Sequence, residues 1–154
     1  MRAPAAPLVG LLVLLVGVAP SLADARAIEG DLLEVEGEIV RLRGIDAFAP
    51  EQTCLTQRGQ PWRCGLAAKA TLATLIQGQA VGCTALDQDA GGHYLARCTT
   101  QNGTDLGGFL VSSGLAFARG PYGSEYEDEE TAARQRRTGA WSGTFTPPWQ
   151  WREQ

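Results

Sequence analysis

The chain has 154 residues and a formal net charge of −4, from 17 acidic and 13 basic residues. A protein that binds nucleic acid by displacing counterions normally presents a basic face, so this balance argues against strong nonspecific binding of nucleic acid. Lys69 is the one lysine of the chain, and the other basic residues are arginines. A local arginine cluster could still serve a small site.

The first residues, MRAPAAPLVGLLVLLVGVAPSLADARA, combine a positive start, an apolar run over residues 8–18 and small residues at 23–25. This layout predicts a secretory signal peptide over residues 1–25, cleaved after Ala23 or Ala25. The apolar run is shorter than the roughly 20 residues of a membrane span; the alternative is an uncleaved N-terminal anchor. We expect residues 26–154 to form one domain, exported to the periplasm or secreted, without stable membrane association after cleavage.

Residues 28–45 contain two β-rich runs around Glu36-Gly37, which predicts a hairpin. Its register decides which side chains share a face. A two-residue turn pairs Leu32 with Arg41 and puts Asp31 on the opposite face from Arg41. A three-residue turn brings Asp31 and Arg41 to one face, and the sequence leaves both registers open.

Residues 65–78 predict a helix, because Leu66, Ala70, Ala73 and Ile76 recur at helical spacing and a glycine follows. The next segments, 80–85 and 94–99, flank the turn-rich DQDAGG and predict a second hairpin.

The four cysteines are an even number, which in an exported protein favours disulfides over thiols or zinc. If the second hairpin is centred between residues 90 and 91, Cys83 and Cys98 lie directly opposite. Cross-strand β-carbons lie within about 5 Å, close enough for a disulfide. We therefore predict a Cys83–Cys98 pair and, by elimination, a Cys54–Cys64 pair.

Helices are expected again near the end of the chain. Residues 105–113 predict a short helix with Asp105 in its first turn, and residues 115–118 an extended piece. Residues 125–139 begin acidic and end basic, as a helix dipole favours, and we interpret them as a solvated helix. The tryptophans of the tail should pack on the domain. This order of strands and helices suits a small closed β-barrel with helices packed on it, and we expect a monomer.

Charged side chains concentrate at Glu29, Asp31, Arg41 and Asp46. Carboxylates at the rim of a barrel suit a hard cation such as calcium, and an adjacent arginine offers a planar fork for phosphate. A metal ion beside an arginine supplies the charge neutralisation that attack on a phosphodiester needs.

The segment GDLLEVEGEIVRLRGIDA resembles the thermonuclease (staphylococcal nuclease-like) family, whose pattern runs D-G-D-T and then R-L-x-G-I-D-x-P-E. Later segments resemble exported bacterial members in the same order, namely QTC, PWRCGLAAKATLATL, VGC, LARC, DLGGFLVSSGLAFA, ETAAR, GAW and PPWQWR. The resemblance covers nearly all of the mature chain. It implies a mixed α+β, mainly β fold, a five-stranded OB-type β-barrel with about three packed helices. The activity it implies is calcium-dependent endonucleolytic hydrolysis of DNA and RNA.

Carried over residue by residue, the resemblance makes Asp31 and Asp46 the metal-binding aspartates, with Ca²⁺ as the cofactor. Arg41 matches the phosphate-binding arginine. Glu29 and Leu32 replace the first aspartate and the threonine of D-G-D-T.

The chain departs from the family pattern at the position of the catalytic glutamate. Family members read G-I-D-x-P-E-x-x-Q, and the six steps from aspartate to glutamine are kept between Asp46 and Gln52. An alignment without gaps puts the glutamate on Ala49 and leaves Glu51 two residues late. Two residues of extended chain span about 7 Å, farther than a general base can move and still reach the attacking water. We favour replacement by Ala49 over Glu51 as a displaced base.

The second catalytic arginine is also replaced. The family places it in Y-G-R-x-x-A at the second hairpin, where this chain has His93. A histidine is mostly neutral at pH 7 and offers no bidentate fork, so we interpret His93 as an exposed hairpin residue. The sequence thus predicts a nuclease-fold domain with degenerate catalysis that binds nucleic acid weakly or an unnamed protein partner. The alternative is an active secreted endonuclease that uses Glu51.

Overall fold

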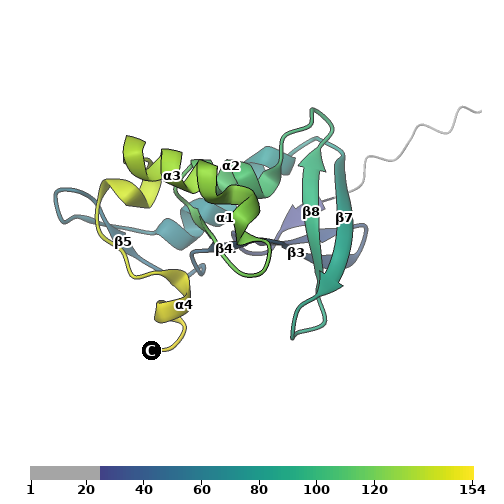
Figure 1. Cartoon of the computed structure of the whole chain (residues 1–154), viewed down its shortest axis with the longest axis horizontal. Coiled ribbons are helices and arrows are strands. Elements are labelled where there is room, and N and C mark those ends of the chain that lie inside the picture. The colour runs from purple at the N-terminus through teal and green to yellow at the C-terminus, as the bar shows by residue number, and fades with distance from the viewer. Residues whose placement is uncertain (1–24) are drawn as a thin grey trace, which may run out of the picture.

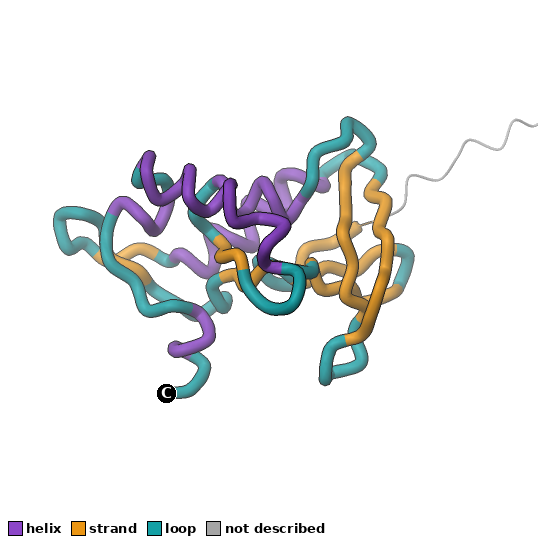
Figure 2. Tube along the Cα trace, in the orientation of Figure 1, coloured by secondary structure: helices purple, strands orange, loops and turns teal. Residues whose placement is uncertain are grey.

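The computed structural model describes residues 25–154, so the predicted signal peptide, except for its last residue, lies outside the described part of the chain. A five-stranded sheet has the order β1-β2-β3-β8-β7 (Figure 1, Figure 2). Its strands are β1 (Ala25–Ala27), β2 (Leu32–Val35), β3 (Glu38–Leu42), β7 (Val81–Gln88) and β8 (Tyr94–Thr100). β3 and β8 run parallel, whereas the other neighbours are antiparallel.

The first hairpin turns through Glu36 and Gly37, whose φ angles are 54° and 85°. A two-residue turn of type I′ needs both angles in the left-handed region, where glycine carries no steric cost. Leu32 is consequently paired with Arg41, which is the two-residue register. Asp31 still contacts Arg41, because it lies in the bend before β2 and does not follow the alternation of the strand.

The second hairpin pairs Cys83 with Cys98, and a disulfide joins them across a Cα separation of 4.1 Å, as predicted. Its loop is closed by a hydrogen bond from the Asp89 amide to the His93 carbonyl, which centres it on Gly91. A β-bulge in β7 absorbs the extra residue and keeps the cysteines opposite one another.

Two short ladders complete the strands of the described chain. β4 (Ile45–Ala47) pairs with β9 (Ala116–Ala118), and β5 (Cys54–Leu55) pairs with β6 (Pro61–Trp62). The predicted Cys54–Cys64 disulfide is confirmed, and it ties β5 to the start of the first helix.

The helices are α1 (Cys64–Ile76), α2 (Leu106–Ser112), α3 (Glu127–Arg136) and α4 (Pro148–Trp151), with 3₁₀ turns η1 (Gly123–Tyr126) and η2 (Gly139–Ser142). The helix predicted over 65–78 is confirmed, but of the four apolar residues at helical spacing Ile76 alone is buried. Leu66, Ala70 and Ala73 are exposed. The disulfide at the first residue of α1 holds the helix in another rotation. Its buried row is Cys64, Ala68, Leu72 and Ile76.

The other helices agree with the sequence. Asp105 lies just before α2 and caps it, its side chain accepting a hydrogen bond of 3.0 Å from the Gly108 amide. α3 carries four acidic residues in its first turn and two arginines in its last, as its dipole favours.

Apolar side chains form two clusters. The larger lies between the sheet and helices α1 and α2, and includes Leu33, Leu42 and Leu72. The smaller is aromatic and joins the loop after β4 to the C-terminal segment. Its rings come from Phe48, Trp62, Phe117, Trp141, Phe145 and Trp149. The prediction that the tail tryptophans pack on the domain is confirmed for Trp149, and α4 lies next to β4.

The mixed α+β class is confirmed. The ladder order leaves β1 and β7 as the ends of the main sheet, so closure into a barrel stays a prediction. Within residues 25–154, no helix has the length and apolar character needed to cross a membrane.

Candidate functional site

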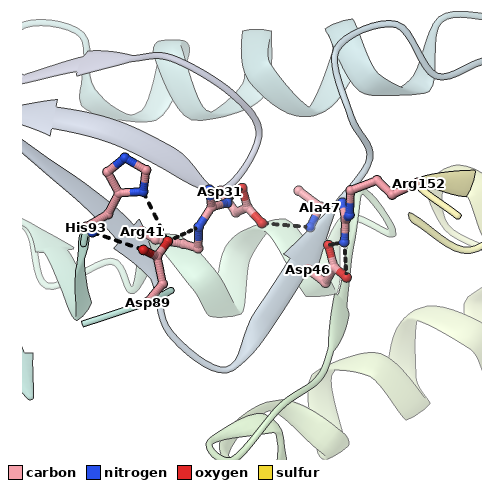
Figure 3. A network of polar contacts seen from close by, with 7 residues as sticks. All are labelled: Asp31, Arg41, Asp46, Ala47, Asp89, His93 and Arg152. Atoms are coloured by element: carbon pink, nitrogen blue, oxygen red, sulfur yellow. Dashed lines mark hydrogen bonds and ion pairs between the residues drawn. The ribbon is translucent and has the colours of Figure 1, made fainter. Parts of the chain in front are cut away.

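Asp31 is at the centre of a polar network (Figure 3). Its side chain is buried, and the residue is 5% exposed. One carboxylate oxygen accepts a hydrogen bond of 3.0 Å from Arg41 Nη1, and the other accepts one of 3.2 Å from the Ala47 amide. Burial raises the pKa of Asp31 to about 6, against the opposing effect of the Arg41 charge and the Ala47 hydrogen bond. The carboxylate is held in place by two donors and is costly to ionise.

Arg41 is fixed between two carboxylates. Its Nη1 donates to Asp31, and its Nε donates to Asp89 Oδ2 over 3.0 Å. Asp89 begins the loop between β7 and β8 and also accepts hydrogen bonds from the backbone amides of Gly91 and His93. Burial tends to raise the pKa of Asp89, but the donors from His93, Arg41 and Gly91 outweigh it and hold that pKa well below its usual range. The guanidinium therefore has a fixed orientation on the face of the sheet.

Asp46 is the second predicted metal residue, and β4 presents it opposite Phe117 of β9. Both of its carboxylate oxygens contact a single nitrogen, Arg152 Nη2, at 2.7 and 2.6 Å (Figure 3). Arg119 Nε lies 3.9 Å from Asp46 Oδ2. The Arg119 guanidinium stacks over the ring of Trp149, 4.0 Å from its centroid.

A pocket with a volume of ≈ 470 Å³ opens at this network. Formal charges in its lining cancel, because three carboxylates face three guanidinium groups. Its lining residues are Glu29, Asp31, Arg41, Ile45, Asp46, Arg119, Gly120 and Arg152. The structure thus brings the four charged residues singled out in the sequence into one pocket and adds two arginines to them.

The chain matches a family model along much of this fold. Residues 39–143 match the model described as "Staphylococcal nuclease homologue". The chain belongs to the staphylococcal nuclease homologue family. The segment matched contains β3, the β4 strand with Asp46 and both disulfides.

Relatives of this nuclease-fold chain include a succinoglycan biosynthesis protein, ExoI, of Rhizobium meliloti, which is 31% identical over 124 residues. That alignment covers 79% of this chain and 65% of the relative, so the chain spans just under two thirds of that protein. A protein named as an uncharacterized endonuclease of Escherichia coli O157:H7 is 28% identical over 132 residues, covering 82% of this chain and 81% of the relative. An Escherichia coli protein with the same name matches equally.

The calcium ion typical of the staphylococcal nuclease homologue family does not fit the donor set as it stands. Asp31 and Asp46 are both hydrogen-bonded to guanidinium groups, which would have to leave before either carboxylate could coordinate a cation. No group of three or more acidic, histidine or cysteine side chains arranged to hold a metal ion occurs among residues 25–154. Calcium binding would need a rearranged pocket.

The two candidate general-base positions of this nuclease-fold chain lie outside the pocket lining. Ala49 is half-buried, and its amide donates to Gln52 Oε1 over 3.3 Å. Glu51 is exposed in the turn that follows. Neither residue contributes to the pocket surface.

His93 is connected to the site indirectly. Its ring Nδ1 lies 3.1 Å from Asp89 Oδ2, the carboxylate oxygen that also accepts from Arg41. The ring therefore contacts Asp89, the carboxylate that also pairs with Arg41, and does not line the pocket.

Sequence reasoning missed Asp89, Arg119 and Arg152. Asp89 lies in the turn-rich segment that was interpreted only as a hairpin loop. Arg119 directly follows the extended piece LAFA, and Arg152 follows the tail tryptophans. The arginine-rich basic composition was the available signal, but it gives no position in space.

Proposed function

We propose that this chain is an exported staphylococcal nuclease-fold domain that binds a phosphate-containing anion in its arginine pocket and hydrolyses phosphodiesters poorly or not at all. Single-stranded nucleic acid is the ligand that family membership favours. The observation that carries the proposal is the convergence of three guanidinium groups on one pocket. Two of the three carboxylates in its lining, Asp31 and Asp46, are already paired with arginines, and the third is Glu29.

Phosphate binding is supported by the guanidinium N–H groups that the ion pairs with Asp31, Asp46 and Asp89 do not use. Arg152 contacts Asp46 through Nη2 alone, and Arg41 uses Nε and Nη1. A guanidinium carries five N–H groups in a planar fork, so each arginine keeps further donors for a phosphate. The equal number of carboxylates in the pocket keeps the affinity modest, in line with the net negative charge of the chain.

Loss of hydrolysis is supported by the position of the acidic residues. Removing a general base typically lowers the rate by about 10²–10⁴-fold. Glu51 lies in an exposed turn outside the pocket, and Ala49 carries no proton acceptor. His93 in the place of an arginine removes a further charged stabiliser.

Export is part of the proposal. We propose residues 1–25 as the signal peptide and residues 26–154 as the single mature domain. The two disulfides support this, because thiols of cytosolic proteins remain reduced. We also propose that the five-stranded sheet belongs to an OB-type barrel, as family membership favours, and that the mature protein is a monomer.

Binding is tested by the fluorescence anisotropy of a labelled single-stranded oligonucleotide in EDTA at low salt. We expect saturable binding that weakens as salt is raised, because phosphate contacts release counterions. Arg119→Gln should weaken it at least about 5-fold, whereas Arg136→Gln, at an exposed position of α3, is the matched control. Equal affinity of the two variants for the oligonucleotide would show that it does not bind in this pocket.

Hydrolysis is tested on DNA and RNA in calcium against an active member of the family. We expect the wild-type rate to be lower by at least about 10²-fold, and Glu51→Ala to leave it unchanged. Ala49→Glu combined with His93→Arg should raise it.

The second candidate function is an active secreted endonuclease with Glu51 as the base, and the names of the two Escherichia coli relatives favour it. Robust wild-type cleavage that Glu51→Ala abolishes would establish that function and refute loss of catalysis.

A further inference from the structure

The C-terminal segment supplies a cation to Asp46. Arg152 lies 106 positions after Asp46 in the chain, and its Nη2 atom contacts both carboxylate oxygens at 2.7 and 2.6 Å. A divalent ion bound in bidentate fashion occupies this same position relative to a carboxylate. The Asp46 side chain is 13% exposed and that of Arg152 is 47% exposed, so the carboxylate is shielded from solvent more than its partner.

The segment that carries Arg152 is anchored. Pro148 is buried, and the Trp149 ring packs edge-on against Phe117 with centroids 5.7 Å apart. Just before α4, the Thr146 carbonyl accepts a hydrogen bond of 2.6 Å from the buried side chain of Gln52. These contacts limit the freedom of Arg152, so little entropy is lost when it pairs with Asp46.

Charge favours the guanidinium over a divalent ion in this pocket. With Arg152 in place, three positive and three negative side chains line it. A divalent cation would enter beside three guanidinium groups and would compete with Arg41 for Asp31 and with Arg152 for Asp46. Removal of Arg152 leaves the lining with an excess of one negative charge and removes both hydrogen bonds to Asp46, which then keeps only Arg119 Nε at 3.9 Å.

We propose that Arg152 is an internal counter-ion that replaces a divalent cation at Asp46 and keeps such ions out of the pocket. With Arg152 in place the folded domain binds no divalent cation at Asp46. When Arg152 is removed, Asp46 becomes able to bind one. This inference rests on the geometry of the Arg152–Asp46 pair and is independent of the proposed ligand and of the loss of hydrolysis.

The test compares the melting temperature of the mature protein in EDTA and in about 10 mM calcium, without nucleic acid. We expect the wild-type melting temperature to be the same in both. Arg152→Gln should melt about 3–8 °C higher in calcium than in EDTA, because a site of roughly millimolar affinity stabilises the folded state by mass action. Calcium titration by calorimetry should show binding to the variant and none to the wild type.

Two further variants make the assignment specific. Adding Asp46→Asn to Arg152→Gln should abolish the calcium effect. Arg134→Gln is the matched control, since Arg134 pairs with Glu130 at side-chain exposures of 56% and 12%, against 47% and 13% for Arg152 and Asp46. It should leave the protein insensitive to calcium.

Calcium binding by the wild type as strong as by Arg152→Gln would overturn the proposal. It would equally be overturned if Arg152→Gln folds but binds no calcium. If that variant does not fold, Arg152→Lys decides: its ammonium should keep calcium out, and a gain of calcium binding there would refute replacement by charge.

Discussion

The buried amide of Gln52 links two segments that are far apart in the chain, since its Nε2 atom donates to the carbonyl of Thr146, 94 positions later, over 2.6 Å. Its Oε1 atom accepts from the amide of Ala49. Gln52 is 0% exposed, so its own amide group has no water as a substitute for these two partners. The loop after β4 and the C-terminal segment are therefore held at a fixed distance.

Replacement of Gln52 by leucine should destabilise the protein. The side-chain volume is roughly kept, but the Ala49 amide and the Thr146 carbonyl lose their partner, which costs about 2–3 kcal/mol of unfolding free energy. Urea denaturation measures the loss. Gln57→Leu, at an exposed position of the turn between β5 and β6, should change stability by less than about 0.5 kcal/mol. Equal effects of the two substitutions would contradict the role given to Gln52.

Gly65 should tolerate no side chain. A β-carbon there would lie 1.6 Å from the carbonyl oxygen of Ala49, which is backbone and cannot turn aside. We expect Gly65→Ala to cost about 3 kcal/mol, the upper part of the range for overpacking. Gly82→Ala is the control, because no atom lies within 4 Å of the added carbon. Thermal melts of both variants check this, and an unchanged melting temperature for Gly65→Ala would mean that the loop is displaced easily.

The two disulfides should differ in what their loss disturbs. Replacing either pair by alanines should cost about 2–4 kcal/mol, since both close short loops. Cys54 and Cys64 lie in the aromatic cluster with Trp62 and Trp141, whereas the other pair belongs to the hairpin. Only removal of Cys54–Cys64 should therefore shift the tryptophan emission of the folded protein. If the tryptophan emission shifted only when Cys83 and Cys98 were replaced, the tryptophans would not be coupled to the Cys54–Cys64 disulfide.

The buried carboxyl of Asp31 should make stability depend on pH. Its folded pKa of about 6 lies above the 3.8 of an unperturbed aspartate, so the folded state binds this proton more tightly than the unfolded state. The stabilising contribution of the protonated carboxyl is fully present below about pH 4 and is lost as the pH rises through about 6.

Asp31→Asn keeps a neutral group at every pH, so its unfolding free energy relative to wild type should increase by about 2–3 kcal/mol between about pH 4 and pH 7. Urea denaturation at several pH values measures this difference. Asp87→Asn, at an exposed position of β7, controls for the substitution itself. A difference that stays constant with pH would show that Asp31 is ionised throughout.

Local patterns in the sequence predicted the local structure well. The Cys83–Cys98 pair followed from hairpin symmetry, whereas Asp105, predicted in the first turn of a helix, lies one position before it as the cap. The inner face of α1 did not follow, because its rotation depends on a disulfide to another segment. Leu66 recurs at helical spacing in the sequence, yet it is 38% exposed.

The candidate site was predictable only where its residues share one hairpin and the strand that follows. Asp31, Arg41 and Asp46 belong to that stretch, and family patterns place them together. Arg119 and Arg152 reach the pocket through tertiary packing on Trp149 and Phe117, which no spacing rule encodes. Their contacts with Asp46 are therefore visible only in three dimensions.

The short distance between the pocket and the tail has a practical consequence for recombinant work. Gln154 follows Arg152 by two positions, so an affinity tag inserted after Gln154 would begin two residues from the arginine that contacts Asp46. A polyhistidine tag would carry its own metal-binding imidazoles to the mouth of the pocket. The loop around Gly59, where an added β-carbon would meet no atom within 4 Å, is a safer place for purification handles or fluorescent labels.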